Sequence, residues 1–267
     1  MTILDDIMRY KRNEELPRRM KIREPALVQA EATLAPKPKA FVPALQATER
    51  MALIAEVKKA SPSKGLLRHN FEALALASTY AENGAAAISV LTDGKYFQGK
   101  LEYLTQIRDG LQAAQGSSRP VILRKDFIFQ PYQVYEARAA GADALLLIAA
   151  VLSDRELADL LALTRKLQLT ALIEVHDQTE LERVLPLEPR LIGVNNRDLR
   201  DFSVDLNTCI TLRQYVPAGC CFVAESGIHT AADVARLSRE GIDAILVGEA
   251  LVKAKNVGQK VRELAGS

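Results

Sequence analysis

The sequence predicts an α/β fold, a (β/α)8 TIM barrel with an extra N-terminal helical segment. From about residue 50 onward, short apolar runs alternate with amphipathic helical patterns, and several helical patterns end at a glycine. The runs are apolar on both faces, as expected for parallel strands that helices cover on both sides. Eight such units over about 220 residues fit a closed barrel better than a doubly wound sheet, where five or six strands are usual.

The eight predicted strands share this apolar character. They are residues 53–57, 87–91, 121–124, 144–148, 171–174, 191–194, 222–224 and 244–247. Gly84, Gly141 and Gly241 each stand just before a run, where a left-handed glycine can end the preceding helix. No GxGxxG motif follows any predicted strand, which disfavours a dinucleotide-binding sheet.

Residues 1–48 are predicted to form an N-terminal helical extension and tether, and residues 49–267 to form the barrel as part of a single domain. Leu4 and Ile7 recur at helical spacing, and a proline-spaced stretch at 25–43 follows them. We expect this segment to cover part of the barrel's mouth as a lid. A solvated basic tail is the alternative.

Composition narrows the class of protein. Lys and Arg number 35 against 33 Asp and Glu, a formal net charge of +2, so no broad basic surface for nucleic acid is expected. No apolar stretch reaches the roughly 18 to 20 residues that span a bilayer, and no secretory signal begins the chain. Cys209, Cys220 and Cys221 lack the spacing of a zinc site and are expected to be reduced packing residues. These features predict a cytoplasmic protein that binds neither nucleic acid nor membranes.

Polar side chains stand at the ends of five predicted strands, which is where catalytic groups of this fold lie. They are Glu56 and Lys58, Lys125, Glu174, Asn195 and Arg197, and Glu225. Glu56, Lys125, Glu174 and Glu225 belong to the first, third, fifth and seventh strands, and alternate strands contribute to the same layer of a barrel. These four side chains are therefore expected to converge. The set could form structural ion pairs, but Glu and Lys together also supply an acid and a base for catalysis.

A second signal follows the last two predicted strands. Ser226 and Gly227 follow the seventh and Gly248 and Glu249 the eighth, each pair opening a helix whose backbone N–H groups could hold a phosphate. Two ordinary turns are the alternative. The three histidines, at 69, 176 and 229, are isolated in the sequence and indicate no metal site.

Five segments closely resemble motifs of the indole-3-glycerol-phosphate synthase family of tryptophan biosynthesis. They are residues 54–65 (IAEVKKASPSKG), 91–99 (LTDGKYFQG), 123–128 (LRKDFI), 192–199 (IGVNNRDL) and 224–228 (AESGI). The resemblance extends from the N-terminal helix to the last βα unit. It implies a carboxy-lyase that converts 1-(2-carboxyphenylamino)-1-deoxy-D-ribulose 5-phosphate to indole-3-glycerol phosphate, CO2 and water. No cofactor or metal is implied.

The resemblance also implies roles for the catalytic side chains. Lys125 would be the general acid that protonates the keto oxygen of the substrate. Lys58 would hold the substrate carboxylate or assist in proton transfer, and Glu56 would orient the lysines. Glu174 would act in the dehydration half of the reaction, as base or as acid. Asn195 and Glu225 would position the substrate's carboxylate and hydroxyls together with Arg197.

The remaining implied residues bind substrate. Phe127 and Ser61 would line the aromatic and anionic parts of the pocket, and Leu246 belongs to the same set. Ser226, Gly227, Gly248 and Glu249 would present backbone N–H groups to the phosphate. Two positions depart from the family pattern, because Gly94 stands where a carboxylate is common and Glu249 where some members have Ser. A carboxylate at 249 would repel phosphate unless it points away.

Two other functions fit the sequence less well. A phosphoribosylanthranilate isomerase would use a Cys or Asp acid/base pair at its strand ends, which the Glu and Lys set does not match. A barrel that only binds phosphorylated ligands would need neither Lys58 nor Lys125, and both are present.

Overall fold

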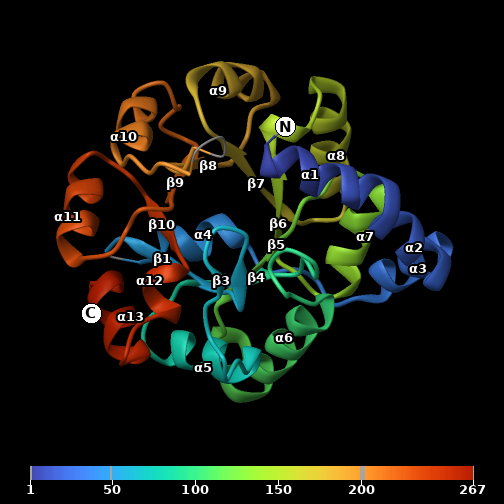
Figure 1. Cartoon of the computed structure of the whole chain (residues 1–267), viewed down its shortest axis with the longest axis horizontal. Helices are drawn as coiled ribbons and strands as arrows, with labels where there is room; N and C mark the ends of the chain where they lie inside the picture. Colours follow the sequence, from blue (N-terminus) through green and yellow to red (C-terminus); the bar gives the residue numbers. More distant parts are fainter. Residues whose placement is uncertain (1, 49, 199–201, 267) are drawn as a thin grey trace.

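Eight parallel strands close into a barrel in this computed structural model, which describes residues 2–48, 50–198 and 202–266 (Figure 1). The strands are β1 (Ala52–Val57), β4 (Ala87–Leu91), β5 (Val121–Lys125), β6 (Ala144–Ile148), β7 (Thr170–Val175), β8 (Leu191–Asn195), β9 (Cys221–Glu225) and β10 (Ala244–Val247). Each strand pairs with its neighbours along the chain, and β1 pairs with β10 to close the barrel. The predicted (β/α)8 fold is confirmed, and every predicted strand matches one of these within a residue at either end.

Helices cover the outside of the barrel. They are α5 (Ala73–Glu82), α6 (Leu101–Gln115), α7 (Pro131–Ala139), α8 (Asp154–Lys166), α9 (Gln178–Val184), α10 (Asn207–Arg213), α11 (Ala231–Arg239), α12 (Glu249–Val252) and α13 (Val257–Ala265), with short 3-10 turns at Gly116–Ser118, Ala149–Val151 and Leu185–Leu187. Gly84, Gly141 and Gly241 have φ angles of 99°, 84° and 73°, so the predicted left-handed helix ends are confirmed. A short hairpin, β2 (Ala60–Ser61) and β3 (Gly65–Leu66), follows β1.

The apolar strands supply two cores. Side chains such as Ile54 and Leu123 point inward and fill the barrel, whereas their neighbours Leu53 and Ile122 pack against the helices. Because both faces of each strand are buried, the strands are apolar at nearly every position before the barrel's carboxyl end, and the buried Ser89 of β4 and Arg124 of β5 are exceptions.

The N-terminal segment is more helical than expected. It contains α1 (Ile3–Tyr10), a π-helical turn η1 (Lys11–Glu15), α2 (Leu16–Ile22), α3 (Pro25–Leu34) and α4 (Phe41–Gln46). Much of the proline-spaced stretch is helical, because Pro25 begins α3 at a position where no backbone N–H is required. Residues 35–40 form an extended link between α3 and α4.

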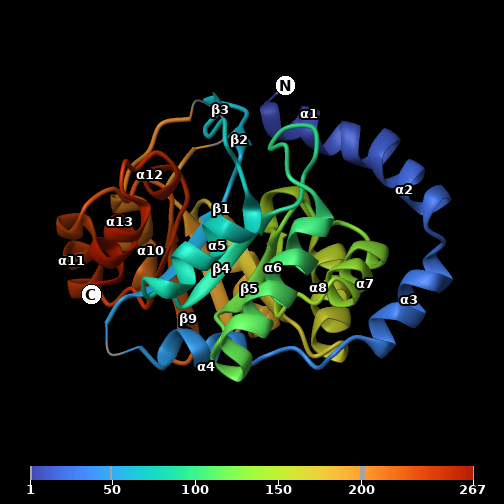
Figure 2. The same ribbon diagram turned by 90° about the horizontal axis from the view of Figure 1, so that it is seen from below.

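The two ends of this segment lie at opposite ends of the barrel (Figure 2). Helix α1 lies near the hairpin β2–β3 at the mouth, while α4 lies at the other end. Phe41 and Leu45 of α4 are fully buried within the interior core and close the barrel's amino end. Residue 49, at the expected domain boundary, and Leu199, the last residue of the 192–199 motif, lie outside the described residues.

Candidate active site

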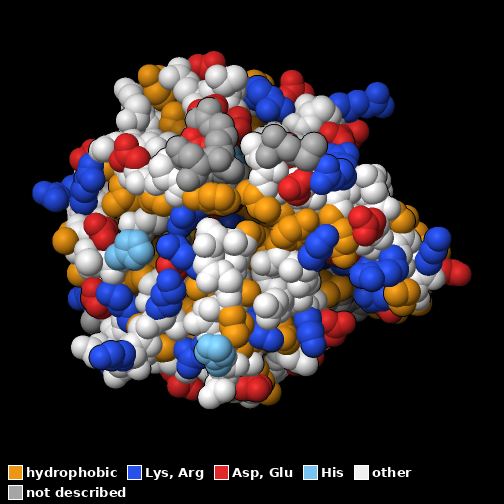
Figure 3. All heavy atoms as spheres, viewed as in Figure 1, with side chains coloured by type: hydrophobic (Ala, Val, Ile, Leu, Met, Phe, Trp, Pro, Cys, Tyr) orange, Lys and Arg blue, Asp and Glu red, His pale blue; other side chains and the backbone are white. Residues whose placement is uncertain are grey.

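A cavity opens at the carboxyl end of the barrel. Its lining includes every candidate site residue from the sequence, namely Glu56, Lys58, Ser61, Lys125, Phe127, Glu174, Asn195, Arg197, Glu225, Ser226, Gly227, Leu246, Gly248 and Glu249. Figure 3 looks into this end and shows hydrophobic side chains across the central hollow, with Lys and Arg side chains beside it. The expected convergence of strand ends on one site is therefore what the structure shows.

Lys125 lies at the centre of the charged part of the cavity. Its Nζ is 2.9 Å from Glu225 Oε2 and 3.3 Å from Glu174 Oε2, so side chains from three alternate strands meet at this ammonium. Burial alone would lower the pKa of Lys125, but the carboxylates of Glu225, Glu174 and Glu56 outweigh burial and raise it well above its ordinary value. Lys125 is therefore a protonated ammonium across the neutral range.

Glu56 and Lys58 form a second pair, with 2.6 Å between Glu56 Oε1 and Lys58 Nζ. Burial opposes ionisation of Glu56, yet Lys58 and Lys125 lower its pKa overall. Gly248 on the neighbouring strand end leaves room for this pair, because a Cβ there would lie 2.3 Å from Glu56 Oε1 and 3.0 Å from Lys58 Nζ. Gly248 thus has a steric role besides any contact of its N–H.

Glu174 has partners that the sequence did not reveal. Asn195 donates a hydrogen bond of 3.3 Å to its Oε1, and the ring nitrogen Nε2 of His176 lies 3.3 Å from the same oxygen. His176 Nδ1 lies 3.1 Å from Glu180, so the imidazole bridges two carboxylates. Burial would favour neutral His176, but Glu174 and Glu180 raise its pKa to about 10.

The protonated imidazole in turn affects Glu174. Burial would favour the neutral acid, but Lys125, His176 and Asn195 hold the pKa of Glu174 well below its ordinary value. Glu174 is therefore an ionised carboxylate in the free protein. His176 follows Glu174 by two residues at the end of β7, and the alternation of a strand places such residues on one face, so this spacing is a signal that could have linked them.

Glu225 has the opposite electrostatic character. Burial and the nearby charge of Glu174 outweigh Lys125 and raise the pKa of Glu225 to about 7. Its Oε1 is buried and has no hydrogen-bond partner within the described part of the chain. A Cβ at Gly193 on β8 would lie 2.2 Å from this oxygen, so Gly193 is a further residue that shapes the site. The adjacent side chains of Asn195 and Leu246 stand in register with Glu225 on the neighbouring strands.

The two glycine-containing loops differ from expectation. Ser226 and Gly227 have φ angles of 67° and 80°, and helix α11 begins only at Ala231 with Thr230 as its N-cap. The expectation that Ser226 and Gly227 open a helix is wrong, because two consecutive left-handed residues cannot start one. Gly248 does cap the four-residue helix α12, which begins with Glu249.

The side chain of Glu249 is held by cations. Its Oε1 is 2.6 Å from Lys253 Nζ, and its Oε2 is 4.0 Å from an Arg197 guanidinium nitrogen. The hydrogen bond from Lys253 is the largest of the effects that lower the pKa of Glu249. The other departure, Gly94, lines a separate cleft beside the N-terminal helices instead of this cavity.

The apolar wall of the cavity includes residues that were not among the candidate site residues. Phe97 lies 6.2 Å from Phe127, measured between ring centres. Ile3, Leu4 and Ile7 of helix α1 line the cavity, which supports the expectation of a lid. Their helical spacing was visible in the sequence, whereas their orientation toward the cavity was not.

In the described ranges, no group of three or more His, Cys, Asp or Glu side chains is arranged to hold a metal ion. Cys209, Cys220 and Cys221 are buried free thiols whose pKa values burial raises to about 11, 11 and 12, as expected for packing residues. No helix among the described residues is long and apolar enough to span a membrane.

Comparison with known proteins gives a consistent result. The family model described as Indole-3-glycerol phosphate synthase matches residues 4–264. Proteins of that name from Roseiflexus sp. (strain RS-1) and Polaromonas sp. (strain JS666) are 54% and 46% identical to this chain, and each alignment covers 99% of this chain and 98% of the relative. The solved structure of 3-hexulose-6-phosphate synthase from Salmonella typhimurium, only 12% identical, overlays with a TM-score of 0.64 over 81% of this chain and 97% of that one, a likeness of fold.

Proposed function

This chain belongs to the indole-3-glycerol phosphate synthase family, and we propose that it carries out the family's reaction in the barrel-mouth cavity with Lys125 as general acid. The enzyme is a carboxy-lyase of tryptophan biosynthesis. Its substrate is the phosphorylated anilino-deoxyribulose, and its products are indole-3-glycerol phosphate, CO2 and water. The family match favours this function over the isomerase and the barrel without catalysis.

The cavity offers a different environment to each end of the substrate. Phe127 and Ser61 would line the aromatic and anionic parts of the cavity, and Lys58 and Arg197 would supply cations for the ring carboxylate. Ser226, Gly227, Gly248 and Glu249 would present backbone N–H groups to the phosphate, and Leu246 also lines the cavity. The pairing of Glu249 with Lys253 and Arg197 supports this, because it reduces the repulsion between Glu249 and a phosphate.

Ring closure requires an acid. The ring carbon that bears the carboxylate attacks the keto carbon, and the keto oxygen takes a proton from the ammonium of Lys125. Lys125 is suited to this step because Glu174 and Glu225 hold it in place and keep it protonated. CO2 then leaves from the same ring carbon, and the electron pair of the broken bond restores the aromatic ring.

Dehydration requires a base and a second acid. The base removes a proton from the carbon next to nitrogen while the new hydroxyl leaves with a proton from Lys58. We assign the base to Glu174, since Lys125 and His176 keep it ionised. Glu56 would orient Lys58, and Asn195 and Glu225 would position the substrate's hydroxyls. Lys125 and Lys58 each donate one proton and Glu174 accepts one. The reaction therefore consumes one proton, which the solvent supplies when the three side chains return to their starting states.

We further propose residues 1–48 as a helical extension whose first helix covers the cavity, and residues 49–267 as the barrel of one domain. The three buried free thiols support a reducing compartment such as the cytoplasm.

The contact that carries this proposal is Lys125 Nζ between Glu174 and Glu225. The test is to add the anilino-deoxyribulose phosphate and follow indole fluorescence, which is visible because the chain has no Trp and seven Tyr. We expect Lys125→Met to lower kcat by at least about 100-fold with the fold intact, and Lys166→Met, on the exposed end of α8, to leave kcat unchanged. A folded Lys125→Met variant with near-normal turnover would remove Lys125 from the acid role.

A further inference from the structure

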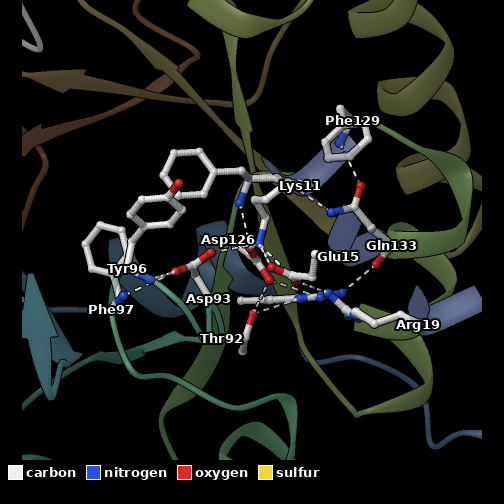
Figure 4. A network of polar contacts seen from close by, with 12 residues as sticks. Lys11, Glu15, Arg19, Thr92, Asp93, Tyr96, Phe97, Asp126, Phe129 and Gln133 are labelled. Carbon is white, nitrogen blue, oxygen red and sulfur yellow. Dashed lines mark hydrogen bonds and ion pairs between the residues drawn. The ribbon is translucent and has the colours of Figure 1, made fainter. Parts of the chain in front are cut away.

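The N-terminal helices place one lysine in the interior of the protein. Lys11, the first residue of the π-helical turn η1, has a side chain that is 1% exposed. Its Nζ lies 2.8 Å from Asp126 Oδ1, 2.9 Å from Asp93 Oδ2 and 3.2 Å from Glu15 Oε1. Figure 4 shows Lys11 pointing from the N-terminal helix toward Asp93 and Asp126. A π-helical turn is uncommon and is often found at functional sites.

Asp93 orders the loop between β4 and α6. Its Oδ1 accepts hydrogen bonds from the backbone N–H groups of Tyr96, at 2.7 Å, and Phe97, at 3.2 Å. Phe97 then packs against Phe127 and lines the cavity. Lys11 thereby contacts the carboxylate that holds one side of the aromatic wall.

Asp126 orders the other side of the same wall. It follows Lys125 directly, and its Oδ1 accepts a hydrogen bond of 2.8 Å from the N–H of Phe127. Its Oδ2 accepts from Thr92 at 2.6 Å and from Arg124 at 3.2 Å. The ammonium of Lys11 also lies 5.8 Å from the centre of the Phe127 ring. Both halves of the Phe97–Phe127 wall therefore depend on carboxylates that Lys11 joins.

The neighbouring cations cannot replace Lys11. Arg124 pairs with Asp126 and Glu136. Arg19 of α2 pairs with Glu15 and Glu136. Of Arg124, Arg19 and Lys11, only Lys11 forms an ion pair with Asp93. Both Asp93 and Asp126 are fully buried, and a buried carboxylate without a cation is strongly unfavourable. Burial would lower the pKa of Lys11, but Asp126, Asp93 and Glu15 raise it, so Lys11 is charged. Lys11 helps to lower the pKa of Asp126, whereas burial outweighs Lys11 at Asp93 and raises the pKa of that carboxyl.

We propose that Lys11 is a positioning residue: by joining Asp93 to Asp126 it couples the seating of the N-terminal helix to the placement of the Phe97–Phe127 wall that receives the substrate's aromatic ring. The inference rests on the proposed function of this cavity. Lys11 touches neither Lys125 nor the substrate groups that react, so its loss affects binding more than chemistry.

The experiment compares KM with kcat in the fluorescence assay. Lys11→Met keeps a side chain of similar length and removes its charge. We expect it to raise KM by about 10-fold while kcat changes by less than about 3-fold. Hydrogen exchange at the amides of Tyr96 and Phe97 should also become faster. The control is Arg12→Met, the next cation on the same segment, whose ion pair with Glu156 is exposed and whose loss should leave KM within about 2-fold.

A double variant separates the positioning effect of Lys11 from the cost of leaving a buried carboxylate without a cation. It also allows KM to be measured if Lys11→Met does not fold. Lys11→Met with Asp93→Asn removes one charge of each sign, while the amide oxygen introduced by the second change can still accept from Tyr96 and Phe97. We expect this variant to be more stable than Lys11→Met but to keep the raised KM, since the bridge to Asp126 is still missing. A KM near that of the wild type in either variant would overturn the inference. Lys125→Met, assayed in parallel, tests the proposed function separately. If Lys125→Met is inactive but the Lys11 variants have a normal KM, the proposed function stands and only the role of Lys11 is rejected.

Discussion

Gly193 is the position where the smallest possible substitution tests the geometry of the acid/base cluster. It lies on β8 beside Glu225, and a Cβ built there would lie 2.2 Å from Glu225 Oε1 and 3.1 Å from Leu172 Cδ1. The variant Gly193→Ala adds one methyl group and no charge. It acts on Lys125 only by moving Glu225.

The expected displacement follows from that distance. A carbon and an oxygen that are not bonded need about 3.2 Å, so the carboxylate of Glu225 must move by about 1 Å. It is now 2.9 Å from Lys125 Nζ, and such a shift breaks that contact or moves the ammonium with it. Because a misplacement of about 1 Å can lower a rate by about 100-fold, we expect Gly193→Ala to reduce kcat by roughly 10- to 100-fold.

The assay is indole fluorescence at saturating substrate, with circular dichroism to confirm folding. Gly219→Ala is the matched control, because a Cβ at Gly219 meets no atom within 4 Å and its activity should equal that of the wild type. If folded Gly193→Ala turns over at the wild-type rate, the carboxylate of Glu225 does not need its observed position and the reasoning is refuted.

Three further predictions concern His176, Glu249 and helix α1. The pKa of His176 is raised from its ordinary 6.5 to about 10, so its charge stabilises the fold fully below about pH 6.5 and this contribution disappears as pH rises through about 10. Denaturant titrations would compare the free energy of unfolding of the wild type with that of His176→Gln. The difference between the two should decrease as pH rises from about 6.5 to about 10, by at most about 1.4 kcal/mol per pH unit, and a difference that stays constant would contradict the assignment. Glu249→Ser removes a carboxylate from the phosphate end and should lower KM by about 2- to 5-fold in steady-state assays, whereas an unchanged or higher KM would argue against phosphate binding there. Deleting residues 2–10 removes Ile3, Leu4 and Ile7 from the cavity wall but keeps Lys11 and α4, so KM should rise, and unchanged kinetics would exclude a lid.

The barrel was predictable because its strands obey a simple physical rule. Strands buried on both faces are mostly apolar, with Ser89 as an exception in β4, so β4, β6 and β10 could be located to the residue. The same pattern located the site, since charged residues at the end of an apolar run lie near the barrel's mouth. In β5 the first of them, Arg124, contacts α7, and the next, Lys125, lines the cavity. Glu56, Lys125, Glu174 and Glu225 were found in this way.

What the sequence did not reveal depends on contacts between distant residues. Lys11 continues the apolar stripe of Leu4, Ile7 and Met8, and a charged residue on a buried helix face is a signal that could have been used. Its partners Asp93 and Asp126 lie more than 80 residues away in the sequence, and no spacing rule connects them. Gly193 was likewise missed, because the requirement for glycine there arises from the side chain of the next strand.

The division of labour between Lys125 and Glu174 is the central claim, and single-turnover measurements with carboxyl-labelled substrate test it most directly. Label release reports decarboxylation, and fluorescence reports the finished indole. We predict that Lys125→Met slows both signals equally, because ring closure precedes both. In Glu174→Gln, CO2 release should slow modestly because Glu174 also holds Lys125, but CO2 should still appear well before indole because dehydration loses its base. Normal CO2 release by Lys125→Met, or equal slowing of both signals in Glu174→Gln, would contradict the account.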